Sequence, residues 1–236
     1  MKAAVDADPL ISVIFICSPG NPTGTLIDPS DIKQLLEYKN YKGIVIVDEA
    51  YIDFARVGDK IPSMATFVES YPNLIVLQTL SKSFGLAGIR LGVSISSPEI
   101  ASIFNKTKAP YNISVPTSIL ANTALSADAL ASWNAHINEL NAQKEDLMSK
   151  IVGIPDIGSI LGGNHANFIL VEILGHDGKP CNDRAFAVYK EMAEKSGIVV
   201  RFRGSELGCE GCLRITIGTK QENAKLLQSL EDILSK

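Results

Sequence analysis

The first half of the chain alternates short apolar runs with amphipathic segments. The apolar runs lie at residues 12–17, 44–47, 74–77 and 90–95. Such runs are typical of strands that are covered on both faces. A helix is expected to begin at the capping sequence that starts with Asp28, and another at Pro98. This alternation of strands and helices predicts a parallel α/β sheet.

The second half has a different pattern. Helical periodicity covers residues 117–151, with a break near 126–128, and then residues 183–196 and 221–234. Strand patterns cover residues 166–172, 198–202 and 212–217. Here strands and helices do not alternate regularly, which favours a smaller α+β unit.

We therefore expect two domains, with a boundary near Ile113 and Ser114. Residues 1–113 are expected to belong to a large α/β domain built on a parallel sheet. Residues 114–236 are expected to form a smaller C-terminal α+β domain. A chain of 236 residues is long enough to give each domain its own core.

Composition narrows the classes of protein to which this chain can belong. The formal net charge is −4 and the basic residues are scattered, so no nucleic-acid surface is predicted. Charged residues or prolines interrupt every apolar run that could cross a bilayer. The N-terminal residues 1–8 lack the apolar stretch of a signal peptide. We expect a cytoplasmic protein with no membrane partner.

The spacing of cysteines and histidines can indicate a metal or redox site. Cys209 and Cys212 have the C-x-x-C spacing of a zinc or redox site. A tetrahedral zinc site needs four ligands, but no second cysteine pair lies nearby and His136, His165 and His176 are isolated in the sequence. We therefore expect reduced thiols near the start of a strand, packing or surface histidines, and no metal.

Polar clusters follow the apolar runs where the strands are expected to end. They occupy residues 18–24, 48–51, 79–82 and 88–90. In parallel α/β sheets, ligands bind outside the carboxyl ends of the strands. The first three clusters are therefore expected to converge on one crevice.

Each cluster has an ordinary structural interpretation when it is taken alone. Residues 19–24 could form a rigid turn, Asp48 a helix cap, Lys82 a solvated lysine and Arg90 a surface cation. Together they match the needs of pyridoxal phosphate chemistry. That chemistry requires a lysine amine for an imine, an acid against the pyridine nitrogen, and hydroxyls with an arginine for the phosphate.

Two sets of motifs carry a resemblance to a known family. The first set is Asn21-Pro22-Thr23-Gly24, Asp48-x-x-Tyr51, and Ser81-Lys82 with Arg90. With these motifs the chain resembles the fold-type-I pyridoxal phosphate aminotransferases of classes I and II. Residues 47–54, 79–92 and 211–219 are most similar to the histidinol-phosphate aminotransferase branch of that family. The resemblance runs through the whole chain.

The resemblance implies roles for the residues around the cofactor ring. Lys82 would form the imine with pyridoxal phosphate and later move a proton between the substrate α-carbon and the cofactor C4′. Asp48 would pair with the pyridinium nitrogen. Asn21 and Tyr51 would donate hydrogen bonds to the 3′ oxygen of the ring.

The resemblance also implies which residues hold the phosphate. Ser81 and Arg90 would bind it directly. Thr79 could join them, because it stands three positions before the lysine, where related enzymes often have a serine.

Residues of the second half are implied on the substrate side. Arg214 matches an arginine that meets an anionic group of the substrate, and Arg201 is a second anion ligand, with Arg203 as a nearby rival. Asn167 is a substrate contact or a strand-packing residue. The implied reaction converts histidinol phosphate and 2-oxoglutarate into imidazole acetol phosphate and glutamate, and two arginines could serve the phosphate and the carboxylates in turn.

Family members resembling this chain carry further sequence before the Asn-Pro-Thr-Gly turn. That part includes a glycine turn at a helix N-terminus for the phosphate and an aromatic residue that stacks on the ring. We therefore expect this chain to be the carboxyl-terminal portion of a longer enzyme that is a homodimer at full length. The alternatives are a related aminotransferase or decarboxylase with another phosphorylated or aromatic substrate, and an inactive fragment.

Overall fold

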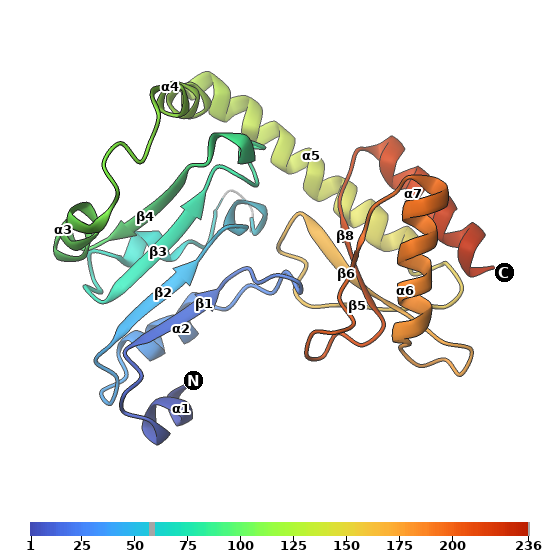
Figure 1. The fold of residues 1–236 in the computed structure, drawn as a ribbon, viewed down its shortest axis with the longest axis horizontal. Coiled ribbons are helices and arrows are strands. Elements are labelled where there is room, and N and C mark those ends of the chain that lie inside the picture. Colours follow the sequence, from blue (N-terminus) through green and yellow to red (C-terminus); the bar gives the residue numbers. More distant parts are fainter. Residues whose placement is uncertain (57–59, 236) are drawn as a thin grey trace. The chain divides into compact units, whose positions relative to one another are not determined.

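The computed structural model describes residues 1–56 and 60–235 of the chain (Figure 1). These residues form two compact units. The first consists of Met1–Gly20 and Leu26–Asn134, and the second of Asn21–Thr25 and Ala135–Lys236. The units divide after Asn134, later than the predicted boundary at residues 113–114, because helices beyond that boundary contact the first unit. Thr117, for example, donates a hydrogen bond to the carbonyl of Ile89.

The first unit is built on a four-stranded sheet. Its strands are β1 (Val13–Cys17), β2 (Ile44–Asp48), β3 (Leu74–Thr79) and β4 (Gly92–Ser96), which lie side by side in that order. The first three are parallel, as the sequence predicted. The prediction of a parallel sheet is wrong for β4, which runs antiparallel to β3. The connection from β3 to β4 contains only the 3₁₀ turn Ala87–Ile89 and no helix to return the chain across the sheet.

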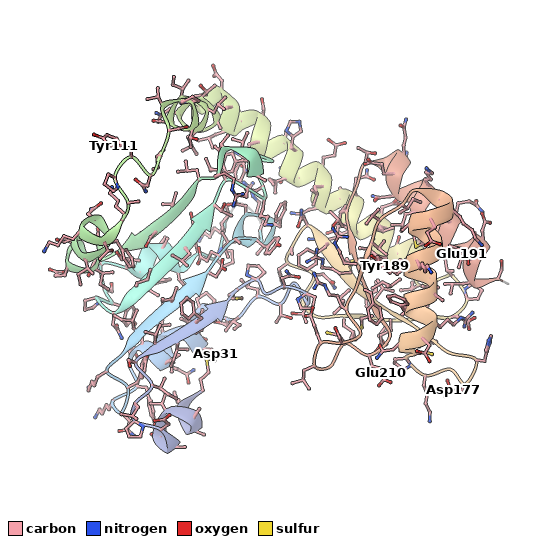
Figure 2. The ribbon with its side chains drawn as sticks, in the orientation of Figure 1. Asp31, Tyr111, Asp177, Tyr189, Glu191 and Glu210 are labelled. Atoms are coloured by element: carbon pink, nitrogen blue, oxygen red, sulfur yellow. The ribbon has the colours of Figure 1, made fainter. Side chains whose placement is uncertain are left out.

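Helices of the first unit fill the connections around this sheet. They are α1 (Lys2–Ala7), α2 (Pro29–Leu36), α3 (Pro98–Thr107), α4 (Val115–Ala124), and the 3₁₀ helices η1 (Ile52–Phe54) and η2 (Met64–Phe67). The predicted cap of α2 is confirmed, since the Asp28 carboxylate accepts a 2.7 Å hydrogen bond from the Ser30 amide. Tyr111, between α3 and α4, points away from the ribbon and is 99% exposed (Figure 2).

The two faces of this sheet differ in burial. Ile32 and Leu35 of α2 pack with Val45 and Val47 of β2, and all four side chains are buried. On the opposite face of β1, Phe15 is 67% exposed. The expectation that this strand is covered on both faces is therefore wrong for the described residues.

The second unit contains a four-stranded antiparallel sheet. Its spatial order is β5 (Ile157–Leu161), β6 (Phe168–Ile173), β8 (Cys212–Thr216) and β7 (Arg201–Phe202). β5 was not predicted, because Gly158 and Ser159 interrupt its apolar pattern. The other strands lie within one or two residues of their predicted positions, except β7, which is limited to the last two residues of its predicted range.

Three helices cover one face of the second sheet. They are the C-terminal part of α5 (Ala127–Ile151), α6 (Asn182–Glu191) with its π-helical extension Met192–Ser196, and α7 (Lys220–Leu234). Leu147, Val188 and Leu230 from these helices form a common buried core with the strands. Among the described residues, no helix is long and apolar enough to cross a membrane.

Side chains alternate between the two faces of the second sheet. Ile169 and Val171 of β6, with Leu213 and Ile215 of β8, belong to the helix-covered core. Arg214 lies between Leu213 and Ile215, so it projects from the opposite face. The predicted anion ligand therefore stands on the face that the helices leave free.

Candidate active site

Lys82 lies in a tight turn that follows β3. The Gly85 amide donates to the Lys82 carbonyl at 3.0 Å, and the Leu86 amide donates to the Leu80 carbonyl at 3.0 Å. Gly85 has a φ of 66°, a left-handed conformation that glycine adopts without strain. The turn leaves the Lys82 side chain exposed at the end of a buried strand, with its Nζ 5.4 Å from the centroid of the Tyr51 ring.

Asp48 is the last residue of β2 and lies beside Cys17 and Leu77 of the neighbouring strands. Its carboxylate accepts a 3.0 Å hydrogen bond from the Ala50 amide. Asp48 thus caps the turn that leads to Tyr51, the residue before η1. A capping contact uses one carboxylate oxygen and leaves the other able to accept a further donor.

The neighbouring Glu49 points into the protein and is only 2% exposed. Its carboxylate accepts hydrogen bonds from Ser63 Oγ (2.6 Å), the Met64 amide (2.6 Å) and Gln78 Nε2 (2.9 Å). Burial raises the pKa of Glu49, and these hydrogen bonds oppose that rise. Asp48 and Glu49 therefore differ in role, since Glu49 ties the segment after β2 to β3.

The hydroxyls before Lys82 lie together. Thr79 Oγ1 is 2.9 Å from Ser81 Oγ and 3.2 Å from the Leu91 carbonyl, which places both hydroxyls close to the chain that carries Arg90. Arg90 has a φ of 55° and is exposed, and its Nη1 donates to the Ala87 carbonyl at 2.9 Å. Two hydroxyls and a guanidinium are a donor set that suits a phosphate dianion.

This part of the first unit fits pyridoxal phosphate in its donor chemistry. It combines an exposed amine beside a tyrosine ring, the Asp48 carboxylate at the end of β2, and phosphate donors next to the amine. The predicted residues Asp48, Tyr51, Thr79, Ser81, Lys82 and Arg90 all belong to this unit.

Asn21 belongs to the second unit. The segment Asn21–Thr25 leaves the first unit between Gly20 and Leu26 and pairs with the loop before β6. The Gly163 amide donates to the Thr23 carbonyl at 3.2 Å, and the His165 amide donates to the Gly24 carbonyl at 2.8 Å. The predicted convergence of the first three polar clusters on one crevice stays a prediction.

Arg214 contacts Asn21 directly. Its Nη1 donates a 2.5 Å hydrogen bond to Asn21 Oδ1, and its guanidinium carbon lies 4.9 Å from the centroid of the Phe168 ring. The two residues are 193 positions apart, so no local sequence signal predicted this contact. Two predicted ligands, one for the cofactor and one for the substrate, are thus brought together.

Arg201 and Arg214 are directly opposite each other on the antiparallel strands β7 and β8. Like charges at opposed positions repel, so an anion placed near both guanidinium groups would be favourable. Arg203 instead forms a 2.8 Å ion pair with Glu206. Arg201 and Arg203, the two candidates for the second anion ligand, therefore differ, because Arg203 forms an ion pair with a carboxylate.

Asn167 precedes β6, and its backbone carbonyl accepts a 2.9 Å hydrogen bond from the Ile217 amide. This bond is made by the backbone and does not choose between the two roles predicted for the side chain, which is half-buried. Beside it lies a residue that the sequence did not single out, Lys144 of α5. The buried Lys144 Nζ donates to the Ala166 carbonyl at 3.1 Å and to Asn141 Oδ1 at 3.0 Å.

The cysteines of the C-x-x-C segment are both buried free thiols. Burial raises the pKa of Cys212 to about 12, which disfavours the thiolate that metal binding and thiol exchange require. Within the described part of the chain, no group of three or more His, Cys, Asp or Glu residues could hold a metal ion.

The family model for aminotransferase class I and II matches residues 1–230. The chain belongs to this family, as its motifs predicted, and its α/β fold is confirmed by solved relatives.

Among individual relatives, the chain is 49% identical over 231 residues to histidinol-phosphate aminotransferase of Schizosaccharomyces pombe, covering 96% of this chain and 59% of that protein. It is 45% identical over 230 residues to the enzyme of the same name from Saccharomyces cerevisiae, covering 97% and 57%. The chain thus spans less than two thirds of the length of these relatives.

Solved structures show the same fold at lower identity. A decarboxylase from Sulfurospirillum multivorans superimposes with a TM-score of 0.85 at 23% identity, covering 98% of this chain and 57% of that one. A histidinol-phosphate aminotransferase from Sinorhizobium meliloti, in complex with pyridoxal 5'-phosphate, gives a TM-score of 0.82 at 22% identity, covering 99% and 60%.

Proposed function

We propose that this protein acts in the pyridoxal phosphate-dependent transamination of histidinol phosphate with 2-oxoglutarate, in histidine biosynthesis. The observation that carries the proposal is the exposed Lys82 at the end of β3, beside Tyr51 and next to the hydroxyls of Thr79 and Ser81. A relative that is 49% identical and bears the name histidinol-phosphate aminotransferase supports the choice of substrate.

When bound, pyridoxal phosphate supplies an aldehyde carbon for amines and a ring that withdraws electrons from the substrate α-carbon. Lys82 Nζ would hold the cofactor covalently and would move a proton between the substrate α-carbon and the cofactor C4′. The Asp48 carboxylate keeps the ring nitrogen protonated. Asn21 and Tyr51 donate hydrogen bonds to the ring oxygen.

The remaining residues bind anions. Ser81, Arg90 and Thr79 hold the cofactor phosphate.

Arg214 and Arg201 bind the phosphate of histidinol phosphate and, in the other half of the reaction, a carboxylate of glutamate or 2-oxoglutarate. An anion between the two guanidinium groups would relieve their repulsion, and this favours Arg201 over the ion-paired Arg203. Asn167 is assigned to the substrate side.

The setting of the protein is part of the same proposal. We assign it to the cytoplasm, as a homodimer at full length, with small-molecule substrates and with neither a membrane nor a nucleic acid as partner. Residues 1–113 are proposed as part of the large cofactor-binding α/β domain, and residues 114–236 as the small C-terminal α+β domain.

Borohydride reduction of the full-length protein with pyridoxal phosphate, followed by peptide mapping, tests the assignment of Lys82. We expect a stable pyridoxyl label on Lys82. Lys144→Met is the matched control, because burial lowers the pKa of Lys144 to about 8 and makes it the rival amine. A label on another lysine, with Lys82 unmodified, would contradict the proposal.

The second candidate function is that of a decarboxylase acting on a phosphorylated or aromatic amino acid. It is supported by the similar fold of the decarboxylase from Sulfurospirillum multivorans. The full-length protein should be incubated with histidinol phosphate and 2-oxoglutarate, and separately with a panel of such amino acids. Glutamate formation supports the transaminase, whereas release of carbon dioxide without glutamate supports the decarboxylase.

A further inference from the structure

The two residues after Lys82 are held by side chains from distant parts of the first unit. Ser83 Oγ donates a hydrogen bond to Asp53 Oδ2 of η1. The Phe84 ring stacks on the Trp133 ring of α5, with centroids 4.9 Å apart and planes inclined by 13°. The lysine turn is therefore clamped on one side by the segment after β2 and on the other by a helix.

Arg56 connects the two sides of this clamp. Its guanidinium lies 5.5 Å from the centroid of the Trp133 ring and donates a hydrogen bond to Asn134 Oδ1. Burial raises the pKa of Asp53, while the Ser83 hydrogen bond and the charge of Arg56 oppose that rise. The cluster thus keeps a half-buried carboxylate beside the turn that carries Lys82.

A comparison with Glu49 separates this clamp from ordinary packing. Glu49 is satisfied by three donors on the segment after η1 and on β3, none of them in the lysine turn. Among the described residues, Asp53 accepts a side-chain hydrogen bond from Ser83 alone. Burying a carboxylate is costly, and here the compensating hydrogen bond is directed at the residue next to Lys82.

The contacts of the Lys82 side chain are too few to fix the position of its amine. Within the described part of the chain, Lys82 Nζ contacts the Tyr51 ring and makes no hydrogen bond. A long, exposed side chain with one ring contact has many rotamers available. The backbone of the turn, and the neighbours that hold it, must therefore limit the region that the amine can reach.

We propose that Asp53 and Trp133 are positioning residues for Lys82, acting through Ser83 and Phe84. They keep the turn 82–85 in the conformation that presents the amine to the cofactor and to the substrate α-carbon. The inference rests on the proposed function, since it requires that Lys82 binds the cofactor and transfers the proton. Misplacement of a reacting group by about 1 Å lowers rates by roughly 100-fold.

Ser83→Ala in the full-length protein, reconstituted with pyridoxal phosphate, is the first test. Ser63→Ala is the matched control, because it also removes a hydroxyl donor from a buried carboxylate, Glu49, but outside the lysine turn. We expect Ser83→Ala to lower kcat by roughly tenfold or more with little change in KM, and to shift the pH titration of the visible absorbance of the Lys82-bound cofactor. Ser63→Ala should lower Tm and leave kcat and the titration as in the wild type.

Trp133→Leu and Trp133→Phe test the other side of the clamp. We expect Trp133→Leu to lower kcat as Ser83→Ala does, and Trp133→Phe, which keeps an aromatic ring on Phe84, to restore most of it. Wild-type kcat and titration in both Ser83→Ala and Trp133→Leu would overturn the inference. Equal effects of Ser63→Ala and Ser83→Ala would also overturn it, because they would show general destabilisation.

Borohydride labelling of the same preparations distinguishes a failure of the proposed function from a failure of the positioning inference. If Lys82 of the wild type takes the label while the variants behave as the wild type, the positioning inference fails and the proposed function stands. If Lys82 of the wild type takes no label, the proposed function fails and the positioning inference fails with it.

Discussion

A residue proposed for the chemistry of the site can also have a structural role in this chain. Asp48 caps the turn after β2 and is also the carboxylate expected against the cofactor ring nitrogen. Its neighbour Glu49, one position along, is buried in hydrogen bonds that tie the segment after β2 to β3. Successive side chains of an extended chain point to opposite sides. The carboxylates of Asp48 and Glu49 therefore have different surroundings and different roles.

Asp48→Asn is expected to reduce turnover far more than it weakens cofactor retention. The amide can still accept the hydrogen bond from Ala50, so the turn is preserved, but it cannot balance the charge of a protonated ring nitrogen. Loss of this stabilisation should lower kcat by roughly 100-fold or more. Steady-state kinetics with histidinol phosphate, together with spectrophotometric titration of the cofactor, would measure both effects. Near-normal turnover would show that Asp48 is a cap and nothing more.

Arg201→Gln is expected to raise the KM of both anionic substrates, by roughly 10-fold or more, because a charged hydrogen bond to each substrate is lost. Arg203→Gln is the matched control. It changes the same residue type two positions away, but Arg203 is ion-paired with Glu206 and should leave KM within about twofold of the wild type. The reverse order of effects would assign the anion site to Arg203.

Elements of the second unit carry the segment that contains Asn21. The loop between β5 and β6 pairs with Asn21–Thr25 through two backbone hydrogen bonds, and Lys144 of α5 holds the Ala166 carbonyl at the end of that loop. At Gly162, a Cβ atom would lie 1.9 Å from the Thr23 carbonyl oxygen, so the close approach requires glycine. The position of Asn21 thus depends on how α5 and this loop pack.

Lys144 makes the stability of the second unit depend on pH. Burial lowers the pKa of Lys144 to about 8 from its usual 10.5, whereas the charge of Glu145 opposes the fall. Burial, and after it the charge of Lys144, also lowers the pKa of His165. Between about pH 8 and 10.5 the unfolded state binds more protons than the folded state. The free energy of unfolding should therefore rise with pH in this window, relative to that of Lys144→Met.

Urea unfolding followed by circular dichroism at several pH values between 8 and 10 would measure this trend. Lys150→Met, which changes an exposed lysine on the same helix, is the control and should give a flat difference from the wild type. A flat difference for Lys144→Met as well would mean that Lys144 keeps its usual pKa.

For the molecule as a whole, the main feature is an uneven distribution of burial. The second unit has helices on one face of its sheet and a continuous core. In the first unit, α2 covers one face, but Val13 and Phe15 on the edge strand β1 remain exposed on the other. An edge strand with exposed apolar side chains is a site of association between chains.

Phe15→Glu is expected to reduce self-association of the 236-residue chain in solution. The charge would have to be buried in any contact that covers β1, which is unfavourable. Leu207→Glu is the control, since Leu207 is fully exposed on a loop of the second unit, outside any sheet edge. Sedimentation velocity at several concentrations would compare the two. Identical association of the wild type and Phe15→Glu would show that β1 is not the contact surface.

Most elements and the family could be predicted from the sequence alone, whereas the roles of the site residues stay predictions. Apolar runs, capping residues and the spacing of Asp48, Lys82 and Arg90 depend on neighbours a few positions away, so local patterns carry them. The antiparallel direction of β4, the division of the units after Asn134, the contact of Arg214 with Asn21 and the clamp of Asp53 and Trp133 on the lysine turn were decided only by the tertiary structure. These features join residues far apart in the chain, and such pairings depend on how the elements pack rather than on any local pattern.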